Sequence, residues 1–197
     1  MVLVELGLPE GLDPGAALEG LFEAAVAAGL ASDGVIAQSE AQRAEFWTLR
    51  ESIPLANRRI GAIASHDISL PLSAIPAFLA EAGPALAALG DWRINAFGHL
   101  GDGNLHYNVA HPLDSTVEAH MTHYSELSQR VHDSAHAHGG SISAEHGIGQ
   151  RKLSMLPRYK SAVELDLMRR IKQALDPLNL LNPGKVLASV ESRSTAP

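Results

Sequence analysis

The sequence predicts an α+β domain, with helices packed on one face of a mainly antiparallel sheet. Segments with helical periodicity alternate along the chain with short apolar segments that are typical of strands. Two of the strand-like segments follow each other directly, separated only by a glycine-containing turn. Hydrophobic residues make up 46% of the 197 residues, which is enough to bury a core. Together these observations favour helices layered on an antiparallel sheet.

The first part of the chain shows signals for two strands and two helices. Val2–Leu6 and Val35–Ala37 are short apolar runs that predict strands. Between them, Gly15–Gly29 is rich in alanine, with leucines at helical spacing, and predicts a helix with a C-terminal glycine cap. Ser39–Gln42 is a capping-box pattern that opens a second helix, which Pro54 should interrupt or kink.

The middle of the chain predicts the sheet itself. Strands are expected at Ile63–Leu70, Trp92–Phe97 and Asn104–Ala110, the last two forming a hairpin or lying as neighbours. A helix of about Ala74–Ala88 separates the first two strands, and a long helix of about Ser115–His138 follows the third.

The last part of the chain predicts a short extended stretch and one more helix. Gly139 and Gly140 end the long helix, and Ser141–Ser143 follows in an extended conformation. The helix expected at Lys160–Leu175 carries an apolar stripe of Val163, Leu167 and Ile171. We expect residues 1–187 to form one domain and residues 188–197 a flexible tail.

Charge and composition exclude several classes of protein. The formal net charge of -7, without a basic cluster, argues against nonspecific binding to nucleic acid phosphates. The absence of cysteine excludes disulfides and thiolate metal sites. Neither a signal-like leader nor an apolar run long enough to cross a bilayer occurs. The lack of cysteine fits a reducing cytosol, and we expect a cytoplasmic protein, with membrane association of a longer full-length protein left open. Ten histidines favour a search for imidazole and carboxylate metal ligands.

The most informative stretch reads NAFGHLGDGNLHYNV. His99 and His106 flank a turn that contains Gly101 and Gly103, two residues that tolerate positive φ. Such a turn can fold back and bring both imidazoles to one point. By the two-residue alternation of a strand, one polar face is shared by Asn104, His106 and Asn108. That face should line a site, with Asn108 as a candidate substrate contact; the alternative is that it faces bulk water.

A second cluster follows the double glycine, in the sequence SAEHGIG. Glu145 and His146 are adjacent and point apart in an extended stretch, so that one could bind a metal while the other faces a substrate. Glu145 joined to His99 and His106 would make a set of two histidines and one carboxylate. Three protein ligands leave positions open for water or substrate, as in catalytic sites. The alternative is a loop acid beside a solvated histidine.

Other signals are less specific. Arg50 offers a planar guanidinium that suits a carboxylate, although it could also be a surface arginine covering apolar stems. The Gly101-x-Gly103 pattern lacks the third glycine of a dinucleotide fingerprint, and we reject that interpretation. A solvated face of the long helix is expected to hold His120, His123, His132 and His136.

Five motifs occur in order along the chain: LRESIP, HDISLP, GHLGDGNLHYNV, GGSISAEHGIGQRK and LDPLNLLNPGKVL. Over roughly residues 40–188 they resemble the C-terminal domain of FAD-linked 2-hydroxy-acid oxidases and dehydrogenases. That family includes D-lactate dehydrogenase, the glycolate oxidase flavoprotein subunit and D-2-hydroxyglutarate dehydrogenase. The resemblance implies a ferredoxin-like α+β fold that caps the flavin of FAD, which an N-terminal FAD-binding domain, absent from this chain, would hold. The chain is therefore expected to be an excised domain or a piece of a longer polypeptide.

The resemblance also implies a role for each candidate residue. A divalent metal, commonly zinc, would be held by His99, His106 and Glu145. His146 would take the proton of the substrate hydroxyl, and Arg50 would bind the substrate carboxylate. The segment near the flavin would include Asn182, Gly184 and Lys185. Some relatives carry a substrate-holding lysine just before the HD-type pair, whereas this chain has Ser65 there.

The implied activity is oxidation of a D-2-hydroxy acid, such as D-lactate, glycolate or D-2-hydroxyglutarate, to a 2-oxo acid. The substrate would chelate the metal, and its hydride would pass to FAD. Without the flavin domain the chain should be inactive, and its uncovered face should favour homo-oligomers. Two alternatives stay open: a metal-dependent hydrolase, and a non-catalytic, metal-stabilised interaction module.

Overall fold

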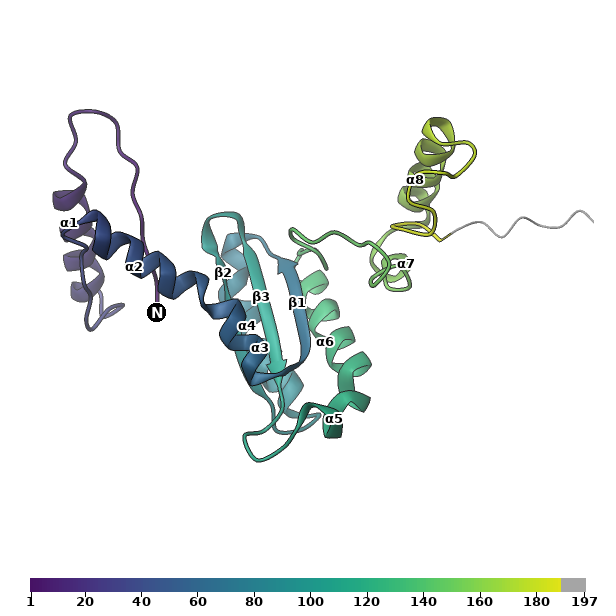
Figure 1. Ribbon diagram of the computed structural model, residues 1–197, viewed down its shortest axis with the longest axis horizontal. Helices are drawn as coiled ribbons and strands as arrows, with labels where there is room; N and C mark the ends of the chain where they lie inside the picture. The colour runs from purple at the N-terminus through teal and green to yellow at the C-terminus, as the bar shows by residue number, and fades with distance from the viewer. Residues whose placement is uncertain (189–197) are drawn as a thin grey trace, which may run out of the picture. The chain divides into compact units, whose positions relative to one another are not determined.

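The computed structural model describes residues 1–188 and separates into two compact units, Met1–Arg59 and the chain from Ile60 onward (Figure 1). The expected flexible tail, residues 188–197, lies outside the described residues apart from Ala188. Within residues 1–188, no helix combines the length and the apolar character that crossing a membrane requires.

The first unit consists of helices and connecting segments. Its helices are α1 (Pro14–Ala27), α2 (Glu40–Glu51) and α3 (Ile53–Ile60), the last of which ends at the first residue of the second unit. Half of the predicted capping box is present, since the Ser39 hydroxyl accepts the Gln42 backbone N–H at 3.3 Å. The Gln42 side chain instead accepts the backbone N–H of Gln38, at 2.7 Å. The predicted interruption at Pro54 is also present, because α2 ends before this proline and α3 starts anew beside it.

Two predicted strands of the first unit are wrong. Val2–Leu6 and Val35–Ala37 are not strands, and both Val2 and Val35 are largely exposed. An apolar run becomes a stable strand only when its backbone pairs with a neighbour and one of its faces is buried. Since no side chain of residues 1–59 is buried, apolar composition alone led to the wrong prediction here.

The second unit is built on a three-stranded antiparallel sheet in the order β1-β3-β2. The strands are β1 (Ala62–Ser69), β2 (Arg93–His99) and β3 (Asn104–Ala110), close to their predicted ranges. The predicted hairpin is confirmed, and its connection is the 3-10 turn Leu100–Asp102 followed by Gly103. Gly103 has a φ of 73°, and a Cβ there would lie 2.0 Å from the carbonyl oxygen of Leu70, so a side chain has no room.

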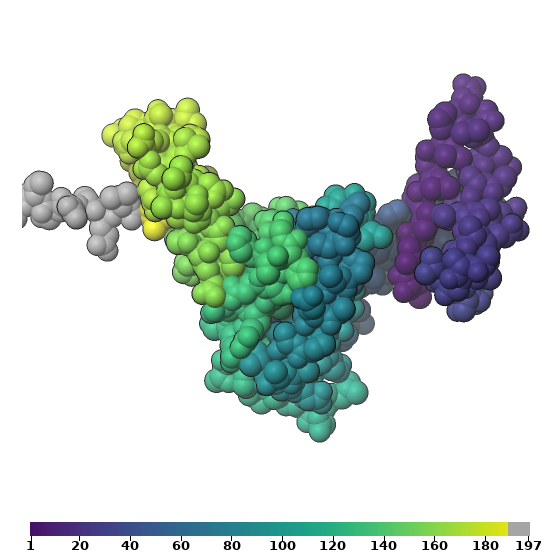
Figure 2. Space-filling view, turned by 180° about the vertical axis from the view of Figure 1, so that it is seen from behind, coloured from purple at the N-terminus to yellow at the C-terminus, as the bar shows by residue number. Residues whose placement is uncertain are grey.

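Two helices, α4 (Ile75–Ala87) and α6 (Tyr124–Ala137), pack on one face of this sheet, which confirms the predicted α+β class (Figure 1). A 3-10 turn at Leu72–Ala74 leads into α4. Seen from behind in Figure 2, the two helices lie side by side and form a continuous surface. These two helices therefore cover one face of the sheet, and the other face of the sheet is turned away from them.

The single helix predicted over Ser115–His138 is wrong in its first half. There, α5 (Val117–His120) gives way to a 3-10 turn at Met121–His123 before α6 begins. The Ser115 hydroxyl lies 2.8 Å from Nε2 of His120, and the Trp92 ring packs edge-on against His120 at 5.5 Å. Both contacts involve residues outside α5, and the helical periodicity of a sequence does not predict such contacts.

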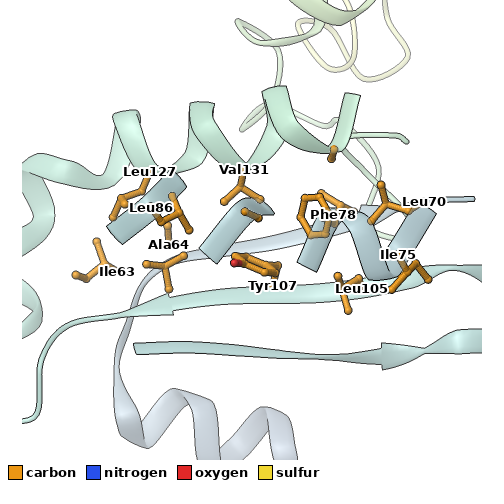
Figure 3. Close-up of a cluster of buried hydrophobic side chains, with 14 residues drawn as sticks. Ile63, Ala64, Leu70, Ile75, Phe78, Leu86, Leu105, Tyr107, Leu127 and Val131 are labelled. Atoms are coloured by element: carbon orange, nitrogen blue, oxygen red, sulfur yellow. The ribbon is translucent and has the colours of Figure 1, made fainter. Parts of the chain in front are cut away.

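The hydrophobic core lies between the sheet and the helices α4 and α6 (Figure 3). Leu105, Tyr107 and Val109 point into it, as the alternation along β3 predicted. Phe78 of α4 is fully buried and meets Tyr107 edge-on, with ring centroids 5.4 Å apart. This packing fixes which face of β3 remains for polar side chains.

The C-terminal helices are α7 (Leu156–Tyr159) and α8 (Ala162–Leu175), the second close to its predicted range. A complete capping box, formed by Ser161 and Glu164, begins α8. Leu165 is the buried residue of α8. The apolar stripe identified in the sequence is instead exposed at Val163, Leu167 and Ile171.

Two histidines lie together in the core. His66 stands opposite Tyr107 in the strand register, and its Nδ1 lies 2.8 Å from the Tyr107 carbonyl oxygen. His132 of α6 meets the His66 ring edge-on at 5.1 Å and is 3% exposed, so the expectation of a solvated His132 is wrong. Burial lowers the pKa of His66 to about 3 and that of His132 to about 4. Both rings are therefore neutral in the folded protein near pH 7.

Replacing Phe78 with alanine should lower the free energy of unfolding by about 3–5 kcal/mol, because it empties space between α4 and the sheet. The neighbouring Leu79 is 41% exposed, so Leu79→Ala is a matched control that should cost less than about 1 kcal/mol. Chemical denaturation measures both values. Equal losses in the two variants would contradict the core drawn in Figure 3.

Replacing His132 with leucine should reduce the loss of stability on acidification. A buried neutral imidazole with a lowered pKa stabilises the fold fully above about pH 6.5, and this contribution is lost as the pH falls towards 4. The wild type should therefore lose on the order of 2 kcal/mol more than His132→Leu between pH 7 and about 4.5.

The charged and titratable groups around His132 are His66, Lys152, Asp133 and Tyr159, and all of them remain in this variant. His136→Leu, on an exposed position of the same helix, is the control. Denaturation curves at both pH values measure this difference in stability. An identical pH dependence of stability in the wild type and in His132→Leu would refute the lowered pKa of His132.

Candidate metal centre

The face of the sheet opposite the core is polar and carries the candidate site. Residues that stand opposite each other in adjacent strands share a face, and His106 stands between Asp67 of β1 and Phe97 of β2. The same face also carries, by register, Ser65, Ser69, Asn95, His99, Asn104 and Asn108. The predicted polar face of β3 is thus part of a polar surface that extends over all three strands.

His99 and His106 lie on this face as diagonal neighbours. His99 stands opposite Asn104, which is two residues from His106 along β3. Diagonal pairs of this kind are about 7–8 Å apart at their Cα atoms, within reach of each other for long side chains. His99 is exposed and His106 is partly buried. Of the two glycines singled out in the turn, Gly103 requires its positive φ, whereas Gly101 lies within the 3-10 turn.

The segment 141–149 is attached to the free edge of β1. Ser141 exchanges backbone hydrogen bonds with Ser69, at 2.8 and 3.2 Å, and the Ala144 N–H donates to the Asp67 carbonyl oxygen at 3.2 Å. The ammonium of Lys152, which follows the segment in the chain, donates to the Ile142 carbonyl oxygen at 2.7 Å and so holds the start of the segment as well. The expected extended stretch at Ser141–Ser143 is therefore a bridge that brings the following residues to the polar face.

Glu145 and His146 approach His106 at this point. The Oε1 atom of Glu145 lies 3.2 Å from Nε2 of His106 and 3.6 Å from Nε2 of His146. The rings of His106 and His146 are stacked with centroids 5.9 Å apart. A carboxylate and two imidazoles from distant parts of the chain thus meet over the centre of the sheet.

Asp67 lies beneath this cluster and is 4% exposed. Its Oδ2 accepts the backbone N–H groups of Glu145 and His146, at 3.1 and 2.8 Å, and the Ser143 hydroxyl at 3.4 Å. Burial raises the pKa of the Asp67 carboxyl, but these backbone N–H groups and nearby positive charge outweigh burial and hold the pKa below its ordinary value. Asp67 is therefore a buried anion.

Sequence reasoning assigned no role to Asp67. The signal was present, because an acidic residue within the apolar strand segment IASHDISL is unusual unless the carboxylate has partners. The partners lie 78 and 79 residues further along the chain, and only the tertiary structure identifies them.

Potential ligand atoms of Asp67, Glu145 and His146 all lie within 4.8 Å of one another. Among residues 1–188, this compact group does not include His99 or His106, although His106 contacts Glu145 directly. The structure thus brings together Glu145 and His106 from the predicted metal-ligand set and puts His99 on the same face. The ligand assignment as a whole stays a prediction.

The other predicted site residues lie in different places. Asn108 is buried, and its amide donates to the carbonyl oxygens of Asn95 and His106, both at 3.3 Å. Arg50 belongs to the first unit, in the last turn of α2. Their predicted roles as substrate contacts stay predictions.

The predicted flavin-side residues come just before a residue that contacts the segment 141–149. Asn182, Gly184 and Lys185 precede Val186, whose backbone N–H donates to the Gly149 carbonyl oxygen at 2.8 Å. Gly149 closes the SAEHGIG sequence that carries Glu145 and His146. The role of these three residues towards a flavin stays a prediction.

Residues 1–186 of this chain match a protein family described as "FAD linked oxidases, C-terminal domain". The D-2-hydroxyglutarate dehydrogenase of Xanthomonas citri pv. viticola is 44% identical over 184 residues, which cover 92% of this chain and 39% of that protein. The mitochondrial D-2-hydroxyglutarate dehydrogenase of Arabidopsis thaliana is 39% identical over 170 residues, or 86% of this chain and 29% of that protein.

A third relative, the D-2-hydroxyglutarate dehydrogenase of Stutzerimonas stutzeri, is 35% identical over 175 residues, or 85% of this chain and 36% of that protein. The chain thus spans less than two fifths of the length of each of these relatives. The motifs, the α+β fold and the match over residues 1–186 agree, and the chain belongs to the FAD-linked oxidase C-terminal domain family.

Proposed function

We propose that this domain supplies the substrate-binding and metal-binding part of a flavin-dependent dehydrogenase that oxidises a D-2-hydroxy acid to a 2-oxo acid. The observation that carries the proposal is the meeting of His106, Glu145 and His146 over the polar face of the sheet. The relatives named D-2-hydroxyglutarate dehydrogenase make D-2-hydroxyglutarate the leading substrate. An N-terminal FAD-binding domain, in the part of the relatives that this chain does not span, is the proposed partner.

The donor atoms present suit a divalent metal such as zinc. Nε2 of His106 and Oε1 of Glu145 lie 3.2 Å apart, a separation that two ligands of one ion can have. His99, on the same face, would complete a set of two imidazoles and one carboxylate. When bound, the metal would stabilise the alkoxide form of the substrate hydroxyl and so lower its pKa.

His146 is the proposed acceptor of the hydroxyl proton. Its side chain is 66% exposed, so a substrate can reach it, while its backbone N–H is fixed by Asp67. Arg50 is proposed to bind the substrate carboxylate through its guanidinium. FAD would supply the hydride-accepting chemistry. The segment that holds Asn182, Gly184 and Lys185 is proposed to face it.

The choice among hydroxy acids depends on what holds the far end of the substrate. Ser65 occupies the position at which some relatives carry a lysine, and it stands opposite Asn108 on the polar face. A hydroxyl binds a second carboxylate more weakly than an ammonium does. D-lactate, which has no second carboxylate, is therefore the competing substrate. Initial rates of the full-length protein with both acids distinguish the two.

Replacing His106 with alanine should lower the affinity for zinc by at least about 100-fold, because it removes one of three proposed protein ligands. Competition with a chromophoric chelator measures this affinity in the 197-residue chain. The control is His136→Ala, which removes an exposed histidine of α6. Undiminished zinc affinity in His106→Ala would exclude His106 as a ligand.

Replacing His146 with alanine in the full-length protein should slow flavin reduction by about 100-fold or more, while zinc still binds. Stopped-flow absorbance of the flavin, with zinc content measured in the same samples, separates the loss of the base from the loss of the metal. Flavin reduction at the wild-type rate would refute the role of His146. Ester or amide hydrolysis by the chain without any flavin domain would support the hydrolase alternative instead.

A further inference from the structure

The Asp67 carboxylate has two oxygens in different environments. Oδ2 accepts three hydrogen bonds, two of them from the backbone N–H groups of Glu145 and His146. Oδ1 is buried and has no hydrogen-bond partner among the described residues. It faces Nδ1 of His106 at 4.0 Å, whereas Nε2 of the same ring lies beside Glu145. A buried anion with an unused lone pair therefore lies behind one of the two proposed imidazole ligands.

We infer that Asp67 is a positioning residue for the metal centre, because its carboxylate fixes both the segment that carries Glu145 and the orientation of the His106 ring. Through Oδ2 it anchors the backbone of Glu145 and His146. Through Oδ1 it accepts the proton of Nδ1 of His106, which leaves Nε2 as the nitrogen that faces the metal. This inference rests on the proposed metal centre. It adds a residue that holds the His106 ring and the segment of Glu145 at fixed positions relative to each other.

The geometry favours this role over direct coordination by Asp67. Oδ2 already accepts three donors, which is a full complement for one carboxylate oxygen. Oδ1 lies on the Nδ1 side of His106, whereas Glu145 lies on the Nε2 side. Metal-bound imidazoles generally donate their other N–H to a carboxylate, carbonyl or water, and this contact fixes the ring and its tautomer. A hydrogen bond requires the Oδ1–Nδ1 distance to shorten by about 1 Å.

Lys152, the lysine beside Asp67, bonds to backbone oxygens and not to the Asp67 carboxylate. The Lys152 ammonium donates to the Asp67 carbonyl oxygen at 3.5 Å and to the Ile142 carbonyl oxygen at 2.7 Å, both of which are backbone atoms. The carboxylate oxygens themselves face N–H groups, one hydroxyl and the histidines. Oδ1 therefore stays available for His106.

The substitution Asp67→Asn tests this role because it retains the shape of the side chain. The amide oxygen can still accept the N–H groups of Glu145 and His146, but the amide nitrogen cannot accept a proton from His106. The affinity for zinc, measured by chelator competition on the 197-residue chain, should fall by about 10- to 100-fold. The control is Asp133→Asn, which disrupts the Arg158 and Tyr159 contacts of another carboxylate in the same unit. It should lower thermal stability and leave zinc affinity unchanged.

A second measurement needs no variant and so decides the case even if Asp67→Asn does not fold. In the zinc-loaded wild-type chain, ¹⁵N NMR of His106 should show the metal on Nε2 and a slowly exchanging proton on Nδ1. Metal on Nδ1 would overturn the inference, as would unchanged zinc affinity in a folded Asp67→Asn. Failure of the wild-type chain to bind zinc would overturn the proposed metal centre itself, which separates the two results.

Discussion

The hydrogen bonds from Glu145 and His146 to the buried Asp67 carboxylate connect parts of the chain that are nearly eighty residues apart. The other bonds between the segment 141–149 and the sheet are backbone contacts, in which Ser141 pairs with Ser69 and the Ala144 N–H donates to the Asp67 carbonyl oxygen. The bonds to the Asp67 carboxylate are the ones that fix the backbone of Glu145 and His146 themselves. The side chains of Glu145 and His146 are both exposed, so packing does not hold them. A charged acceptor in a buried strand instead holds their backbone, and this positions side chains that must stay accessible to a ligand.

Because side chains alternate between the two faces of a strand, the residues that form the core and the residues that form the cluster lie on opposite faces of the sheet. On β1, His66 faces the core beneath α6, whereas the next residue, Asp67, faces the cluster. On β3, Tyr107 contributes to the core and His106 to the cluster in the same way. A shift of register by one residue would exchange the two sets, so the apolar packing of one face also determines the geometry of the other.

The two units differ in how much of their own surface they bury. The second unit contains the core between the sheet and its helices, whereas residues 1–59 bury no side chain. The apolar stripe of α8 is exposed as well. The first unit carries apolar runs and α8 carries an apolar stripe at helical spacing, but a strand or a helix face becomes buried only when another surface covers it. The relatives are more than twice as long as the matched region, and a further domain is the proposed source of such a surface.

The sequence by itself determined the α+β class, the ranges of β1, β3 and α8, and the β2–β3 hairpin. It also determined which face of β3 points inward and carried the motifs of the family. These features follow from local periodicity, turn chemistry and residue order. The sequence also singled out His106 and Glu145, whose residue types suit a metal. Only the tertiary structure decided that Asp67 lies beneath them, that His132 is buried, and that Val2–Leu6 is not a strand. Each of these depends on which distant backbone or side chain lies within hydrogen-bonding or packing distance, a property that no local pattern encodes.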